Sequence, residues 1–145
     1  MNRTYSLEQV SEIAALLRDS LQSRSIIALT GQLGAGKTTL VQSLLRSWGV
    51  QEAITSPTFT YVNCYKLNTG LIIYHFDLYR LLTLDSFIEF GFDEYLNQTN
   101  SLVIIEWPEI IAPILDKLRD KVLRINLEHL DDGERQISLE VKSGD

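Results

Sequence analysis

The sequence SIIALTGQLGAGKT, residues 25–38, decides the fold of this 145-residue chain. Its apolar run up to Thr30 predicts a short buried strand. A glycine-rich loop follows, and apolar residues at helical spacing then predict a helix from Lys37 to Trp48. Residues 31–38 match the G-x-x-x-x-G-K-[ST] pattern of a phosphate-binding loop (P-loop, or Walker A motif), in the strand–loop–helix context that this motif requires.

The residue types in this loop suit the binding of phosphate. Glycines let the backbone approach a ligand where a Cβ would block it. The loop amides and the positive end of the following helix both favour an anion. Lys37 is long enough to reach β- and γ-phosphates, and Thr38 offers a hydroxyl to Mg²⁺. A plain strand–turn–helix connection needs none of this, so we expect a nucleotide site, although the motif alone does not separate an ATPase, a GTPase and a kinase.

A magnesium–nucleotide site also needs an acidic group at the end of a neighbouring strand. Glu106 ends a predicted strand whose apolar part is residues 102–105, and we expect it to hold the metal directly or through a water. Asp77 follows the apolar residues 71–76 and is the competing acid, suited to orienting a water or supporting the metal's ligands. Trp107, next to Glu106, is either a core residue or part of the site.

Several other residues near these acids could act in the site or could have a purely structural role. His75 faces away from its neighbours in the strand, which favours a satisfied core or surface histidine over a catalytic one. Arg80 contacts phosphate or a partner, or forms a surface ion pair. The segment SPTFT, residues 56–60, either senses the γ-phosphate through its hydroxyls or is an ordinary loop. Cys64 has no base or metal ligand beside it and is interpreted as a packing residue.

The remaining periodicities predict one α/β domain over residues 1–145, with a mixed, mainly parallel sheet and a C-terminal antiparallel hairpin. Ser6 and Gln9 have the spacing of a capping box, and Thr83 is a second candidate helix cap. Helices are predicted over residues 6–22, 83–90 and 108–118 with a helical turn over 93–97, and strands over 59–67, 71–76, 101–107, 122–128 and 136–141.

Composition narrows the class of protein. With 13 Lys and Arg against 19 Asp and Glu, the net charge of -6 argues against an autonomous nucleic-acid-binding protein. A single cysteine excludes an internal disulfide and a multi-cysteine metal site. The chain starts with a polar stretch, and its apolar runs are far shorter than the ~20 residues that a membrane span needs. We therefore expect a cytoplasmic protein without membrane contact.

Four segments, GQLGAGKTT, SPTFT, HFDLYRL and EWPE, occur in this order within residues 31–109. Each is weak alone, but their order and spacing together resemble the bacterial TsaE family (formerly YjeE), over about residues 6–110. The resemblance implies a P-loop ATPase that binds ATP with Mg²⁺. It also implies a role in the threonylcarbamoyl modification of the tRNA adenosine beside the anticodon.

The resemblance assigns roles by position. Lys37, Asp77 and Glu106 would carry hydrolysis, and Thr38 and Glu106 would bind the magnesium ion. Gln32 stands where the family often has Asp, a side chain that the phosphate cradle does not need. The nucleotide-binding residues would be Gly31, Gly34, Ala35, Gly36, Lys37, Thr38, Thr39 and Trp107.

The resemblance also implies partners. The chain would bind the complex of TsaB and TsaD and hydrolyse ATP to support its turnover, with tRNA handled through these partners. No obvious arginine finger follows the loop in the sequence, so a partner would complete the site. A nucleotide switch, in which hydrolysis is incidental, is an alternative that depends on residues 56–60.

A small-molecule kinase on the same loop is a further alternative. Such kinases need a mobile lid that carries arginines. The basic residues after position 80 come late in the chain and form no clear lid: Lys117, Arg119, Lys121, Arg124, Arg135 and Lys142.

Overall fold

The computed structural model describes residues 2–32, 34–57 and 60–140. The expectations for Thr58 and Phe59 lie outside the described residues, as do those for Lys142 and for the end of the last strand at position 141. The predicted single domain over 1–145 is likewise described only for these ranges.

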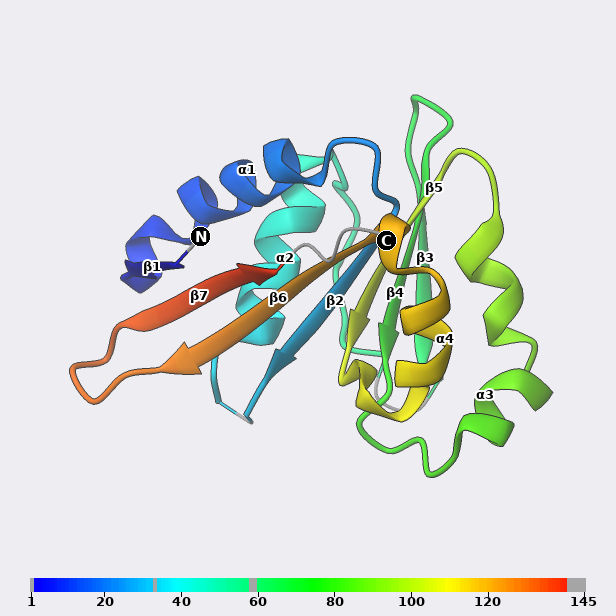
Figure 1. Cartoon of the computed structure of the whole chain (residues 1–145). Coiled ribbons are helices and arrows are strands. Elements are labelled where there is room, and N and C mark those ends of the chain that lie inside the picture. The colour runs from blue at the N-terminus through cyan, green and yellow to red at the C-terminus, as the bar shows by residue number, and fades with distance from the viewer. Residues whose placement is uncertain (1, 33, 58–59, 141–145) are drawn as a thin grey trace.

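Within these ranges, seven strands form one sheet in the order β1-β7-β6-β2-β5-β4-β3. The four central strands β6, β2, β5 and β4 are parallel, while β7 and β3 run antiparallel to them. Because β1 is antiparallel to β7, it points the same way as the central four (Figure 1). The mixed, mainly parallel sheet with a C-terminal hairpin is thus confirmed. The strands are β1 (Asn2–Tyr5), β2 (Ile26–Gly31), β3 (Val62–Lys66), β4 (Ile72–Asp77), β5 (Ser101–Glu106), β6 (Val122–His129) and β7 (Arg135–Glu140).

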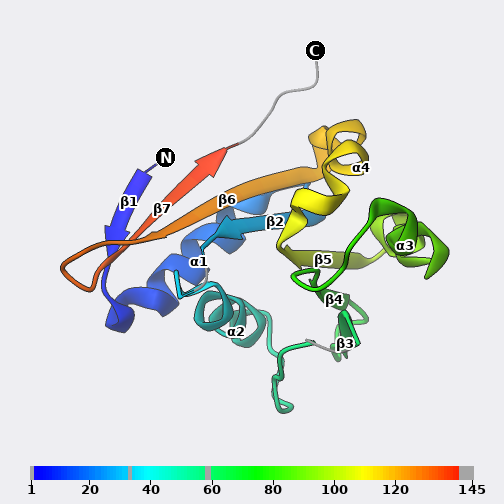
Figure 2. The ribbon, with the colours of Figure 1, turned by 90° about the horizontal axis from the view of Figure 1, so that it is seen from below.

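Helices cover both faces of this sheet. Figure 2 shows α1 and α2 together on one face, and α4 on the other with α3 beside it. Short 3-10 turns precede α1, follow α3 and flank α4. The helices are α1 (Val10–Leu21), α2 (Lys37–Ser47), α3 (Leu84–Glu89) and α4 (Ala112–Lys117), and the turns are η1 (Leu7–Gln9), η2 (Phe92–Asn97), η3 (Pro108–Ile111) and η4 (Arg119–Lys121).

Strand β2 shows why the central sequence is apolar throughout. Ile27 and Leu29 pack in the cluster beneath α1 and α2, whereas Ile26 and Ala28 pack in the cluster on the α4 face. A strand covered on both sides needs apolar residues at every position rather than at alternate ones. The strand is therefore held from both sides up to the point where the P-loop begins.

Local signals in the sequence account for several helix ends. The Ser6 amide donates to Gln9 Oε1 at 2.9 Å, so the predicted capping box is present. It opens a 3-10 turn before α1 rather than a single helix over 6–22. The Ser86 amide donates to Thr83 Oγ1 at 3.1 Å, which confirms Thr83 as the cap of α3.

Three further sequence expectations differ from the structure. The polar residues at the start of the chain form the edge strand β1, where no strand was expected, because pairing with β7 supplies their hydrogen bonds. The predicted helix over 108–118 is a 3-10 turn followed by α4. Cys64 is exposed on the edge strand β3 and is not a packing residue.

Within the described residues, no helix is both long and apolar enough to span a bilayer.

Replacement of Leu44 by alanine tests how firmly α2 is held on the sheet. Leu44 is fully buried beneath this helix, so we expect Leu44→Ala to lower the free energy of unfolding by about 2–5 kcal/mol through lost burial and a residual cavity. Urea denaturation measures the change. Leu82→Ala removes the same atoms from a side chain that is 86% exposed and should stay within about 0.5 kcal/mol of the parent. Equal effects of the two substitutions would contradict the packing described here.

Candidate nucleotide-binding site

The P-loop joins the carboxyl end of β2 to the first turn of α2, and two of its glycines are sterically required. A Cβ on Gly31 would lie 2.7 Å from the Leu127 carbonyl oxygen, because β6 passes close beside the loop. Gly36 has a φ of +95° at the N-cap of α2, a conformation that side-chain-bearing residues rarely adopt. The described residues of the motif thus form the predicted connection from strand to helix, with the amino end of α2 facing the loop.

The Lys37 side chain lies folded back over the loop. Its Nζ donates to the Gly31 carbonyl and, at 3.3 Å, to the Gln32 carbonyl. The same nitrogen sits 3.5 Å from the centroid of the Trp107 ring, a cation–π contact. Burial lowers the pKa of this ammonium group from its ordinary value. Three carboxylates oppose that shift: Glu106, Glu109 and Asp77.

Two acidic side chains meet beside this lysine because of the strand register. Leu29 of β2 pairs with Glu106 of β5, and Glu106 pairs with Asp77 of β4. The Tyr79 amide donates to Asp77 Oδ1 at 3.1 Å, which fixes this carboxylate. A cavity of about 210 Å³ brings together most of the predicted site residues and is lined by Gly34, Lys37, Thr38, Asp77, Tyr79, Arg80, Glu106 and Trp107.

Glu106 has a partner that the sequence did not reveal. Its Oε2 lies 2.6 Å from Nε2 of His75, and both side chains are almost fully buried. The other ring nitrogen, His75 Nδ1, is buried without a hydrogen-bond partner among the described residues. The favoured interpretation of a satisfied histidine is therefore incomplete, since this imidazole holds the carboxylate of a candidate metal ligand. Alternation along β4 and β5 places the two side chains on one face, but only the register shows that they touch.

Trp107 lies between the core and the candidate site. It adopts a left-handed backbone conformation, with φ of 57°, between β5 and η3. Its ring packs against the cluster on the α4 face and contacts Tyr79, with ring centroids 4.9 Å apart. Both interpretations of this tryptophan are thus compatible with its position above Lys37.

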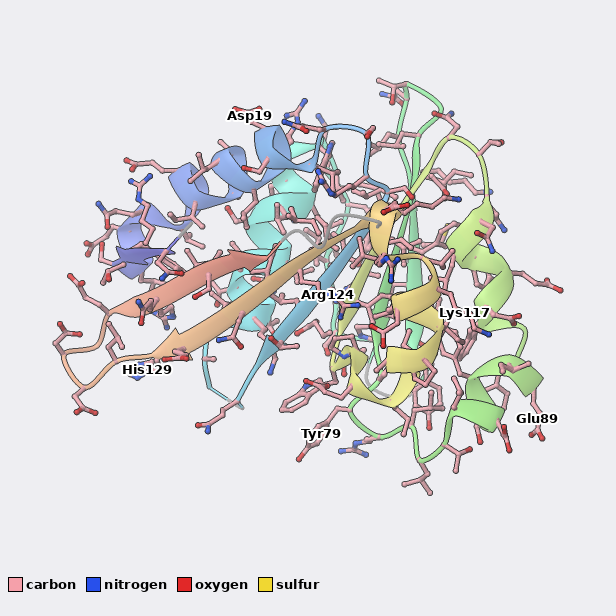
Figure 3. All side chains as sticks on the ribbon, in the orientation of Figure 1. Asp19, Tyr79, Glu89, Lys117, Arg124 and His129 are labelled. Atoms are coloured by element: carbon pink, nitrogen blue, oxygen red, sulfur yellow. The ribbon has the colours of Figure 1, made fainter. Side chains whose placement is uncertain are left out.

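A larger cavity of about 680 Å³ adjoins the loop at the ends of β2 and β6. Such a crevice beyond the carboxyl ends of parallel strands is where α/β proteins bind ligands. In Figure 3, Tyr79 and His129 lie at this end of the sheet. Of the predicted residues, Gly31, Ala35 and Trp107 line it. Residues that the sequence did not single out also line it, including Glu109, Asn126, Glu128 and His129. These residues could have been found only from their positions, after β5 and at the end of β6, because their residue types alone do not indicate a binding site.

The remaining candidates occupy different positions. Thr38 is exposed in the first turn of α2, and Thr39 beside it is partly buried. Thr60 Oγ1 donates to the Val62 carbonyl at 3.4 Å, so this part of the SPTFT segment leads into β3. Arg135, for which no role in the nucleotide site was expected, lies against Gly36.

Comparison with known proteins identifies the class. The crystal structure of YdiB from Bacillus subtilis matches with a TM-score of 0.69 and 29% identity, covering 98% of this chain and 86% of that one. The shared architecture, with the loop between β2 and α2, is the P-loop NTPase fold, and it implies nucleotide binding.

Sequence comparison then gives the family. A family model described as threonylcarbamoyl adenosine biosynthesis protein TsaE matches residues 4–137. A relative from Rickettsia conorii, named tRNA threonylcarbamoyladenosine biosynthesis protein TsaE, is 39% identical over 96% of this chain and 77% of its own length. One of the same name from Treponema pallidum is 40% identical over 82% of this chain and 84% of its own. The chain belongs to the TsaE family.

The contact between Lys37 and Trp107 provides an optical readout of nucleotide binding. Phosphates would draw the ammonium away from the indole, so we expect ADP or ATP with Mg²⁺ to change the intrinsic tryptophan fluorescence. Trp107→Phe should abolish the response. Trp48→Phe should retain it, because Trp48 follows the far end of α2. A response that disappears with Trp48 instead would contradict this geometry.

The pair of His75 and Glu106 is expected to contribute to stability. His75→Phe keeps a ring of similar size but leaves the buried Glu106 carboxylate without this partner, at a cost of about 1–3 kcal/mol in the free energy of unfolding. His129→Phe, at an exposed position, is the matched control and should change stability by less than about 0.5 kcal/mol. Chemical denaturation of both variants makes the comparison, and an unchanged His75→Phe variant would refute the pairing.

Proposed function

We propose that this chain hydrolyses Mg-ATP to support the threonylcarbamoyladenosine modification of tRNA, as an accessory ATPase that binds a TsaB–TsaD complex in the cytoplasm. The observation that carries the proposal is the meeting of Lys37, Thr38, Asp77 and Glu106 around one cavity at the amino end of α2. The names of the relatives supply the tRNA-modification context. The acidic balance of the chain supports tRNA contact through partners rather than directly.

The donor set fits magnesium that arrives with a nucleotide. Thr38 and Glu106 offer the hard oxygen ligands that Mg²⁺ prefers. Within the described ranges, no group of three His, Cys, Asp or Glu residues is arranged to hold a metal by itself. Mg²⁺ is commonly held by one or two side chains plus phosphates, and it supplies neutralisation of phosphate charge. We assign Thr38 and Glu106 to it, with His75 orienting Glu106.

The other residues act through charge and position. Lys37 exchanges its loop carbonyl partners for β- and γ-phosphate oxygens, and the P-loop amides cradle the same phosphates. Asp77, held by the Tyr79 amide, orients the attacking water. Trp107 excludes water from the lysine and contacts the nucleotide. These parts position ATP, and Arg80 lines the same cavity. No obvious arginine finger follows the loop in the sequence, so a partner would complete the site and turnover by the chain alone should be slow.

Among the described residues, the late basic side chains do not gather over the P-loop as the lid of a small-molecule kinase would. Lys117, Arg119 and Lys121 precede β6, whose first residues pair with the start of β2. They therefore lie at the end of the sheet opposite the P-loop. Arg124 is engaged by Asp116 of α4 at 3.0 Å.

Steady-state ATP hydrolysis tests the proposal. The purified chain should turn over slowly alone and be stimulated by TsaB plus TsaD. Lys37→Ala and Glu106→Gln should each lower the stimulated rate by at least about 100-fold, the scale of losing one preorganised charge in a site. Lys117→Ala is the matched control, because this exposed lysine ends α4, on the opposite face of the sheet from α2 (Figure 2). Absence of stimulation and of a complex, or full activity of the Lys37 variant, would refute the proposal.

A further inference from the structure

Arg135 reaches the P-loop from a strand that is far away in the sequence. It is the first residue of β7 and pairs with Tyr5 of β1 on one side and His129 of β6 on the other. A Cβ added to Gly36 would lie 2.9 Å from Cδ and 3.5 Å from Cζ of Arg135, and closer still to Nε. The arginine side chain therefore lies against the last glycine of the loop, where α2 begins.

This arginine has unmet hydrogen-bonding capacity. Its Nε is buried without a hydrogen-bond partner, and no carboxylate forms an ion pair with it among the described residues. The hydroxyl of Tyr5, directly opposite in the β1–β7 pairing and also buried, likewise has no hydrogen-bond partner in the described part of the chain. Buried polar groups in native proteins are nearly always satisfied, so two orphans side by side call for a further group at this place.

Electrostatics indicate which group this is. The amino end of α2 carries partial positive charge, and a guanidinium placed against it is unfavourable unless an anion lies between them. The face of β6 and β7 that carries Arg135 is the one packed against α1 and α2, since Leu127 and Ile137 point into that core cluster. Loop amides, helix end and guanidinium thus converge on one region from different elements.

Lys37 and Arg135 flank the loop from opposite sides of β2. Lys37 lies beside Trp107 and the acids of β5 and β4, the side assigned above to the γ-phosphate and the metal. Arg135 comes from the side of β6 and β7. We propose that Arg135 binds the α-phosphate of the nucleotide. The proposal rests on nucleotide binding at the P-loop.

Titration calorimetry of the full chain with Mg-ADP and with Mg-ATP tests this assignment. Arg135→Gln should raise the Kd for both nucleotides by the same factor of about 10 to 100, because both carry the α-phosphate and a charge-assisted hydrogen bond is lost. Arg135→Lys should weaken binding less, since it keeps the charge but loses the planar fork. The affinity of the Gln variant should also depend less on salt concentration than that of the parent.

Arg124→Gln is the matched control. It makes the same change in the neighbouring strand β6, on the face that carries α4, where Arg124 pairs with Asp116 (Figure 3). It should leave both Kd values unchanged. Lys37→Ala provides the reference for nucleotide binding itself, and urea denaturation without nucleotide checks that each variant is folded.

The outcomes separate this inference from the proposed function. Unchanged binding by Arg135→Gln, with loss of binding by Lys37→Ala, overturns the role of Arg135 alone. A loss confined to ATP places the arginine at the γ-phosphate, and a loss with unaltered salt dependence places it at the ribose or base; either result overturns the α-phosphate assignment. If the Arg135→Gln variant does not fold, the Arg135→Lys variant decides. A folded Arg135→Lys variant that binds ADP as tightly as the parent overturns the α-phosphate assignment. No binding by the parent chain refutes the proposed function.

Discussion

The register of three parallel strands is the constraint on which the site depends. Leu29 of β2 lies beside Glu106 of β5, and Glu106 lies beside Asp77 of β4. All three residues therefore lie near the carboxyl ends of these central strands, where the P-loop begins. A slip of one residue would turn Glu106 toward the other face and away from His75. The geometry of the site therefore depends on this register.

At the carboxyl ends of these strands, the two sides of the P-loop carry different charged groups. Carboxylates gather on the β4 and β5 side around one buried lysine, whereas an arginine without an acidic partner among the described residues stands on the β7 side. The first side suits a metal ion and the reacting end of a phosphate chain. The second suits phosphate without a metal. This uneven distribution of charge favours one orientation of the phosphate chain in the site, even before a nucleotide binds.

Much of this arrangement could be predicted from the sequence. The P-loop and Glu106 were recognisable because their signals are local, a motif in register and an acid that ends an apolar run. Contacts across the sheet were not recognisable. The pairing of His75 with Glu106 joins residues 31 positions apart and depends on the alignment of their two strands. The approach of Arg135 to Gly36 spans almost one hundred positions. β1 was missed because a polar edge strand has the composition of a loop, and its pairing with β7 is decided by a distant segment.

The exposed thiol on β3 gives the molecule a practical handle. Cys64 is the single cysteine of the chain and stands on the outermost strand, at the opposite edge of the sheet from β1. A maleimide dye attached there needs no cysteine to be removed first, and it marks one edge of the domain without touching the P-loop strand. Energy transfer from that dye to a labelled companion would therefore report the orientation in which the domain docks.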